Sequence, residues 1–189
     1  MKKIAIFASG NGTNAENICN YFINNKGIGV VLLATNKKTA FVVERIKKFN
    51  VPVFSFSKEE LNNTTIVQKK LLEYSVDLIV LSGFLLKVPE NIVSLFPNKI
   101  INIHPSLLPK FGGKGMYGEN VCRSVIDAKE IQSGITVHYV NNNYDEGNII
   151  FQEKFTLQKN ETPEGLLEKI KVLEMRFFPV IIEKVINSL

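Results

Sequence analysis

Short runs of apolar residues alternate with segments of helical periodicity along most of this chain, and this alternation constrains the fold most strongly. Strands are predicted for the apolar runs at residues 4–8, 29–34, 53–56, 78–82 and 100–103. Helices are predicted after the turn at 9–14 as far as Tyr21, at 40–49 with Thr39 as the cap, and at 65–74. Strands that alternate with helices form a mostly parallel sheet with both faces covered. We therefore expect an α/β, Rossmann-like fold, as a single domain over residues 1–189.

The last third of the chain continues the pattern with a longer polar connection. A helix is predicted at 118–127, and two strands are predicted at 135–140 and 149–156, joined by a polar turn. Thr162-Pro163-Glu164 is a strong helix start, with a hydroxyl cap, a proline at the first helical position and an acid in the first turn. The final helix is expected to bend at Pro179, because proline removes a backbone hydrogen bond.

Composition and charge exclude several classes of protein. Apolar residues make up 45% of the 189 residues, and there are only two cysteines, which indicates a globular chain without a disulfide framework. The longest apolar stretch, Leu78 to Leu86, is too short for a transmembrane helix. The formal net charge is +5, but the lysines are scattered, which argues against a nucleic-acid partner. We expect a cytoplasmic protein that acts on small molecules and not on membranes or nucleic acids.

The segment Ser9-Gly10-Asn11-Gly12-Thr13-Asn14 follows the first strand and opens a helix. Glycines allow a ligand to approach the backbone, and the amides at a helix start favour a phosphate. With the next alanine the segment also matches a dinucleotide fingerprint, which requires an acid about twenty residues later. No acid occurs between Glu16 and Glu44, so the segment favours a monophosphate site. A turn that needs glycines for geometry alone is the remaining alternative.

A second segment, Asn102-Ile103-His104-Pro105-Ser106-Leu107-Leu108-Pro109, leaves the fifth strand. Strand periodicity places Asn102 and His104 on one face, at the sheet edge where α/β proteins bind ligands. An amide donor beside an imidazole suits acyl transfer, because the amide binds an oxyanion and the imidazole handles protons near neutral pH. A lone histidine in a loop is also compatible with a purely structural role.

This second segment resembles the signature of folate-dependent formyltransferases. Together with the glycine-rich segment, it resembles the branch that transfers a formyl group from 10-formyltetrahydrofolate to the amine of 5′-phosphoribosylglycinamide in purine synthesis. Family members that act on amino sugars or on methionyl-tRNA share the His104 segment, and a tRNA enzyme is expected to carry an additional basic domain. A non-catalytic nucleotide-binding module is the alternative from another class, and the presence of Asn102, His104 and Asp145 argues against it.

The resemblance implies roles for individual residues. Asn102 matches the amide that holds the formyl oxygen, His104 the catalytic imidazole, and Asp145 the acid that raises the pKa of His104. The residues implied in binding the ribonucleotide are Gly12, Thr13, Asn14 and Glu174. Those implied in binding the folate are Leu85, Leu86, Lys87, Val88, Asn102, Asn141, Asn142, Asn143, Tyr144 and Asp145.

Several residues remain outside this assignment. His138 lies in an apolar strand and is expected to be structural, and Cys122 is expected to pack in the core. No basic residue in the short segment between Ser57 and Thr65 is assigned to the folate glutamate tail. Two histidines and two cysteines at wide spacing predict no metal site. The sequence is compatible with both a monomer and a homodimer.

Overall fold

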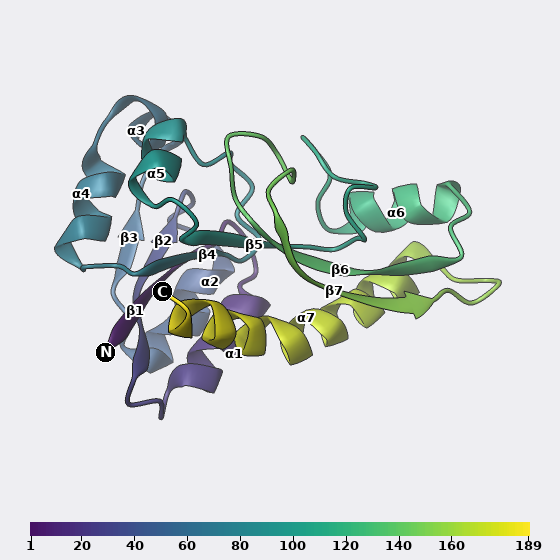
Figure 1. The fold of residues 1–189 in the computed structure, drawn as a ribbon, viewed down its shortest axis with the longest axis horizontal. Coiled ribbons are helices and arrows are strands. Elements are labelled where there is room, and N and C mark those ends of the chain that lie inside the picture. Colours follow the sequence, from purple (N-terminus) through teal and green to yellow (C-terminus); the bar gives the residue numbers. More distant parts are fainter.

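Seven strands form one sheet in the order β3-β2-β1-β4-β5-β6-β7 (Figure 1). In the computed structural model, which describes residues 1–189, neighbouring strands from β3 to β5 are parallel, whereas β6 and β7 are antiparallel to their neighbours. The strands are β1 (Lys2–Phe7), β2 (Ile28–Thr35), β3 (Val53–Ser55), β4 (Leu78–Leu81), β5 (Ile100–His104), β6 (Gln132–Tyr139) and β7 (Ile149–Thr156). The predicted α/β fold with a mostly parallel sheet is confirmed.

Helices cover both faces of the sheet, with α1 and α7 on one side and α3, α4 and α5 on the other (Figure 1). The α-helices are α1 (Thr13–Phe22), α2 (Phe41–Ile46), α3 (Lys58–Asn63), α4 (Ile66–Glu73), α5 (Glu90–Leu95), α6 (Glu119–Asp127) and α7 (Pro163–Asn187). A 3₁₀ turn, η1 (Lys47–Phe49), extends α2. None of the helices is long and apolar enough to cross a membrane.

Two hydrophobic clusters, one on each face, follow from side-chain alternation in the central strands. In β1, Ile4 and Ile6 belong to the cluster beneath α1 and α7, whereas Ala5 and Phe7 belong to the cluster beneath α3, α4 and α5. Successive strand residues point to opposite faces, so a fully apolar strand supplies both layers at once. This explains why the apolar runs of the sequence are continuous.

Two short helices were not predicted, and the predicted cap of one helix differs. Helix α3 begins with a capping box, in which the Ser57 hydroxyl accepts from the Glu60 backbone and the Glu60 carboxylate accepts from the Ser57 backbone. The second unpredicted helix, α5, follows Pro89. Helix α2 is flanked by Ala40, and Thr39 provides no cap, so that prediction was wrong.

Helix α7 continues through Pro179 to Asn187. The buried residues Phe178, Ile181 and Ile182 lie on either side of Pro179. Because packing of an apolar face contributes most of the stability of a protein helix, this burial offsets the hydrogen bond that proline removes.

Candidate active site

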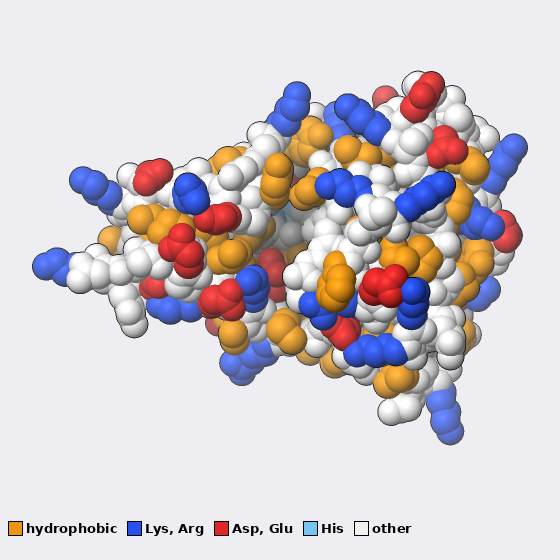
Figure 2. Space-filling model, turned by 180° about the vertical axis from the view of Figure 1, so that it is seen from behind, with side chains coloured by type: hydrophobic (Ala, Val, Ile, Leu, Met, Phe, Trp, Pro, Cys, Tyr) orange, Lys and Arg blue, Asp and Glu red, His pale blue; other side chains and the backbone are white.

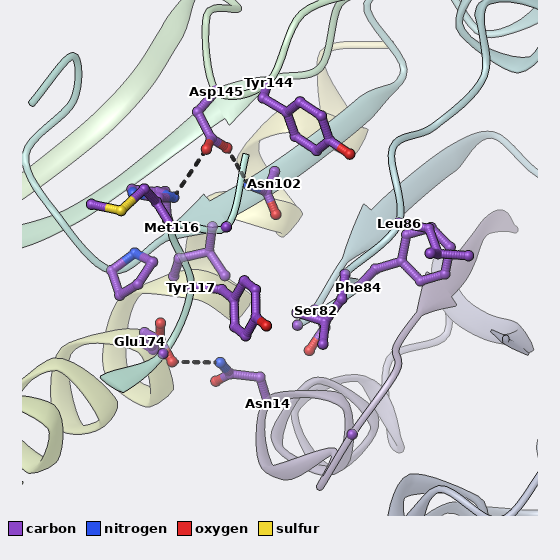
Figure 3. A pocket seen from close by; sticks show the side chains of 18 of the residues that line it. Asn14, Ser82, Phe84, Leu86, Asn102, Met116, Tyr117, Tyr144, Asp145 and Glu174 are labelled. Carbon is purple, nitrogen blue, oxygen red and sulfur yellow. Dashed lines mark hydrogen bonds and ion pairs between the residues drawn. The ribbon is translucent and has the colours of Figure 1, made fainter. Parts of the chain in front are cut away.

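A cavity of about 590 Å³ lies at the carboxyl ends of β1, β4 and β5 (Figures 2 and 3). Its walls come from the segments 10–14, 82–87, 102–105 and 113–118, from Tyr144 and Asp145, and from α7. Since β1 and β4 are neighbours from opposite halves of the sheet order, the cavity lies where the strand order reverses, as expected for an open α/β sheet. Figure 2 shows lysines and arginines spread over this side of the molecule without one basic patch.

The glycine-rich segment forms one wall of this cavity. Gly12 has a φ of 80° and directly precedes α1, so Thr13 and Asn14 occupy the first turn of that helix. A Cβ on Gly12 would lie 2.4 Å from Cγ2 of Val42, which excludes any side chain without movement. The free amides at the start of α1 therefore border the cavity with the polarity that an anion requires.

Asn14 and Glu174, two of the residues implied in substrate binding, contact each other across the cavity wall (Figure 3). The amide nitrogen of Asn14 donates a hydrogen bond of 2.7 Å to Oε2 of Glu174. Burial raises the pKa of Glu174 to about 7, although the Asn14 hydrogen bond and the charge of Lys171 act in the opposite direction. Burial therefore favours the protonated form of Glu174.

His104 and Asp145 lie beside each other, with 3.5 Å between Nδ1 of the imidazole and Oδ2 of the carboxylate. Nε2 of His104 lies 2.8 Å from the Phe111 carbonyl oxygen, so this nitrogen carries a hydrogen and donates it. The imidazole is 3% exposed. Its orientation is fixed on one side by the loop backbone, and Nδ1 remains the nitrogen able to gain a proton.

Burial lowers the pKa of His104 below 6.5, and the charge of Asp145 raises it by a smaller amount. Asp145 therefore acts in the expected direction, but it does not raise the pKa of the imidazole above its ordinary value, because the effect of burial is larger. Burial also raises the pKa of Asp145, but hydrogen bonding with His138, the charge of His104 and the Gly113 amide together lower it below 3.8. The free site thus holds an ionised Asp145 beside a mainly neutral His104.

Asn102 and His138 connect to the same carboxylate. The Asn102 amide nitrogen lies 3.1 Å from Nε2 of His138 and 3.4 Å from Oδ1 of Asp145 (Figure 3 shows the second contact). Nδ1 of His138 lies 2.8 Å from the Tyr139 carbonyl oxygen and donates to it, so Nε2 accepts from Asn102 when His138 is neutral. The sequence analysis predicted His138 to be a structural residue in a strand. Because β6 pairs with β5 and places His138 opposite Asn102, His138 joins this network.

Asp145 occupies a backbone conformation that suits a turn. Its φ is 56°, in the left-handed region that aspartate tolerates better than most residues. The Gly113 amide donates a 2.9 Å hydrogen bond to Oδ2 of Asp145, which ties this turn to the loop that follows His104. Two segments far apart in the sequence thus hold the carboxylate in place.

The residues implied in folate binding are only partly brought to the cavity. Leu85, Leu86, Lys87 and Tyr144 line it, as do Asn102 and Asp145. The amide of Leu85 donates to the Ser9 hydroxyl at 3.0 Å, which anchors this wall to the end of β1. Val88 instead packs in the core, 3% exposed.

Asn141, Asn142 and Asn143 do not line the cavity. They are exposed, and Asn141 and Asn143 satisfy their side chains within the turn, Asn141 by accepting from the Asn143 amide and Asn143 by donating to Glu146. Short polar side chains in a turn commonly form such local bonds.

Other cavity residues were missed from the sequence. Lys58 and Asn62 reach the cavity from α3, and the capping box at Ser57 and Glu60 was a signal for this helix. Ser82, at the end of β4, has a buried hydroxyl without a hydrogen-bond partner. Cys122 packs in the core, as predicted. No group of three or more histidine, cysteine, aspartate or glutamate side chains is arranged to hold a metal ion.

With this geometry established, comparison with known proteins identifies the family. The family model described as formyl transferase matches residues 2–182. This chain belongs to the formyl transferase family. The Bacillus subtilis (strain 168) protein named phosphoribosylglycinamide formyltransferase is 35% identical over 192 residues, covering 99% of this chain and 96% of that protein. The chloroplastic protein of the same name from Arabidopsis thaliana is 39% identical over 176 residues, and the match spans 60% of its length.

Solved structures of this formyl transferase family share the fold described above. The crystal structure of phosphoribosylglycinamide formyltransferase from Bacillus halodurans superposes with a TM-score of 0.87 at 35% identity, covering 97% of this chain and 95% of that one. The structure of glycinamide ribonucleotide transformylase 1 from Symbiobacterium toebii gives a TM-score of 0.90 at 30% identity, and the match covers 100% of this chain and 89% of that one. The similarity thus extends over essentially the whole chain.

Proposed function

We propose that this chain transfers the formyl group of 10-formyltetrahydrofolate to the amine of 5′-phosphoribosylglycinamide, a step of purine synthesis. The observation that carries the proposal is the placement of His104, Asn102 and Asp145 at one end of a cavity whose other wall is an anion-binding helix start. Both features are needed for a phosphorylated acceptor and a formyl donor to meet. Relatives of similar length that carry this enzyme name support the assignment.

The acceptor binds with its phosphate at the amides of Gly12, Thr13 and Asn14. The positive end of the α1 dipole favours the phosphate charge there. The Glu174 carboxylate, on the neighbouring α7, is placed to accept hydrogen bonds from ribose hydroxyls. This orientation directs the glycinamide amine away from α1 and towards Asn102 and His104.

The folate donor binds against the wall formed by Leu85, Leu86 and Lys87, opposite Tyr144. A flat heterocycle requires apolar contact on its faces and hydrogen bonds at its edge, and an apolar loop with exposed backbone groups supplies both. The Lys87 ammonium lies 6.0 Å from the centre of the Tyr144 ring, so the two sides of this subsite are close together. The cations Lys58 and Lys87 are available for the carboxylates of the glutamate tail.

Formyl transfer needs an oxyanion stabiliser and a proton carrier. When the amine attacks the formyl carbon, the Asn102 N–H that is held only at 3.4 Å by Asp145 turns to the developing oxyanion. The His104 imidazolium adds positive charge, gives its proton to the departing N10, and regains one from the attacking nitrogen. Collapse of the intermediate then breaks the bond between the formyl carbon and N10.

Asp145 stabilises the charged form of His104 during these steps. In the free site burial disfavours the imidazolium, but the oxyanion adds a second negative charge near the ring as the intermediate forms. The charged imidazole therefore becomes more stable when the reaction needs it. Protein side chains supply all of these roles without a covalent intermediate on the enzyme.

The decisive experiment combines the purified protein with 10-formyltetrahydrofolate and each of three acceptors, and follows donor absorbance and product mass. We expect turnover with 5′-phosphoribosylglycinamide and none with an amino-sugar nucleotide or methionyl-tRNA. Asn102→Ala serves as the catalytic blank. Turnover with another acceptor alone would overturn the proposed substrate, and binding of both ligands without turnover would indicate a nucleotide-binding module.

A further inference from the structure

The short helix α2 supports the glycine-rich segment from the side away from the cavity, and Arg45 makes the main polar contacts. Nε of Arg45 donates to the Asn11 carbonyl oxygen at 2.9 Å and to Asn11 Oδ1 at 3.1 Å. Nη2 donates to the same Oδ1 at 3.0 Å. One guanidinium thus holds both the backbone and the side chain of the residue before Gly12.

The same guanidinium also reaches the first turn of α1. Nη1 of Arg45 donates to Oε2 of Glu16 at 2.6 Å. The Phe41 ring lies 4.9 Å from Cζ of Arg45, which limits how the planar group can turn. Arg45 therefore connects the segment before the helix with the helix itself, across the amides that border the phosphate site.

Val42, on the same helix, makes one backbone contact and one nonpolar contact with the glycine-rich segment. Its amide donates to the Gly10 carbonyl oxygen at 3.1 Å. Its side chain occupies the space that a Cβ on Gly12 would need. Helix α2 consequently contacts Gly10, Asn11 and Gly12 in succession, and only the Asn11 contacts depend on a long side chain.

We propose that Arg45 is a positioning residue for the phosphate subsite: its guanidinium fork holds Asn11 and Glu16 so that the amides following Gly12 are ordered before the ribonucleotide binds. This inference rests on the proposed function, because it assigns that site's phosphate to these amides. Arg45 does not line the cavity, so it acts through the segment and not by touching substrate. Ordering a loop in advance removes an entropic cost from binding.

The positioning role of Arg45 depends on the planar shape of its guanidinium and not on its charge alone. Three nitrogens of Arg45 are used at once, in directions fixed by the planar group. A lysine ammonium at the same position keeps the charge but cannot bond Asn11 and Glu16 in this geometry. Lys48 provides a matched comparison, because it pairs with Glu16 without contacting Asn11.

The test compares Arg45→Lys, Arg45→Ala and Lys48→Ala in steady-state kinetics with both substrates. We expect both Arg45 variants to raise the KM for the ribonucleotide about tenfold, with kcat and the KM for the folate donor within about twofold of wild type. Lys48→Ala should change none of these values by more than about twofold. A wild-type ribonucleotide KM in Arg45→Lys would overturn the role of the fork, and equal losses for both substrates would indicate a general structural defect.

A second measurement separates this inference from the proposed function. Hydrogen exchange of the Glu16 and Val42 amides in the ligand-free proteins requires no turnover and no identified substrate, and these amides donate to the carbonyl oxygens of Gly12 and Gly10. We expect faster exchange of both amides in both Arg45 variants, unchanged exchange in Lys48→Ala, and unchanged exchange in β4 and β5 of all three, which shows that the fold is intact. Unchanged exchange of the Glu16 and Val42 amides in Arg45→Lys overturns the inference, whereas failure of wild-type turnover overturns only the proposed function.

Discussion

The side-chain amide nitrogen of Asn14 donates a 2.7 Å hydrogen bond to Glu174, which joins the first helix to the last across 160 positions of sequence. Both side chains border the cavity, and burial raises the pKa of the Glu174 carboxyl to about 7. The contact therefore links the fold, the charge of the site and the acceptor subsite in one pair of residues.

Glu174→Gln is expected to stabilise the protein above neutral pH. The Glu174 carboxyl ionises near 4.5 when unfolded but near 7 when folded, so the folded state holds the extra proton between these values. Stability from this group is therefore present below pH 4.5, is lost as pH rises to about 7, and stays lower above it. The difference between the two pKa values corresponds to a gain of about 3 kcal/mol in the variant at pH 8, measured by urea unfolding at pH 5 and pH 8.

Glu183→Gln, on the same helix but outside the cavity, is the control for this measurement. This variant removes the same charge from α7 at a position that is only partly buried. An equal change in both variants would attribute the effect to the net charge of α7 and not to the burial of Glu174. The KM for the ribonucleotide should also be higher in the Glu174→Gln variant, because a neutral amide accepts hydrogen bonds from ribose hydroxyls less strongly than a carboxylate does.

Gly12→Ala is expected to lower stability by about 1–3 kcal/mol and to weaken ribonucleotide binding. The added Cβ would lie 2.4 Å from Val42 Cγ2, and the φ of 80° is strained for alanine. Thermal unfolding measures the first effect, and calorimetric titration with the ribonucleotide and the folate measures the second.

Two further variants test the cause of this loss. Val42→Ala in the Gly12→Ala background should recover only a small part of the stability, because it removes Cγ2 but leaves Cβ and Cα of residue 42 at 2.5 and 2.7 Å from the added Cβ. Gly10→Ala should have little effect on stability, since a Cβ there meets nothing within 4 Å. Equal destabilisation by both glycine substitutions would contradict the packing explanation.

Asn102→Ala and His104→Ala should each lower kcat by about two to four orders of magnitude. Asn102 supplies the proposed oxyanion donor and His104 the proposed proton carrier. Both variants should remain folded, which circular dichroism and thermal unfolding can establish. Near-normal kcat in either folded variant would remove that residue from the proposed mechanism.

Asp145→Asn should lower the pKa of His104 further below 6.5, because the variant removes the charge that raises it. The imidazolium then forms only at lower pH, so residual kcat should increase towards acid more steeply than in wild type. NMR titration of the imidazole and kcat against pH test both statements. Asp77→Asn is the control, since Asp77 accepts from the Lys3 amide at the opposite end of the sheet.

An unchanged His104 titration in Asp145→Asn would contradict the electrostatic role. His138 cannot act as an inert reference, because its Nε2 lies 3.6 Å from Oδ1 of Asp145. The His104 signal should move in Asp145→Asn and stay in place in Asp77→Asn. A lower kcat with an unchanged pH profile would assign Asp145 to orientation of the ring alone.

The sequence by itself determined the features that depend on neighbouring residues. Apolar runs located the strands along the chain, the glycine-rich segment placed a turn before α1, and Thr162 with Pro163 marked the start of α7. Asn102 and His104 are two residues apart on one strand, so strand periodicity alone put them on the same face. Missed helices were short, and only α3 carried a local signal, the Ser57 and Glu60 capping box.

Only the tertiary structure decided which distant residues meet and in what electrostatic state. Periodicity places a residue on a face of its own element, but it does not specify what packs against that face. Pairing of β5 with β6 brought His138 to Asn102, and the crossing of α1 by α7 brought Glu174 to Asn14. Burial reversed the net pKa shift expected for His104, because desolvation depends on the surrounding layers and not on the adjacent sequence.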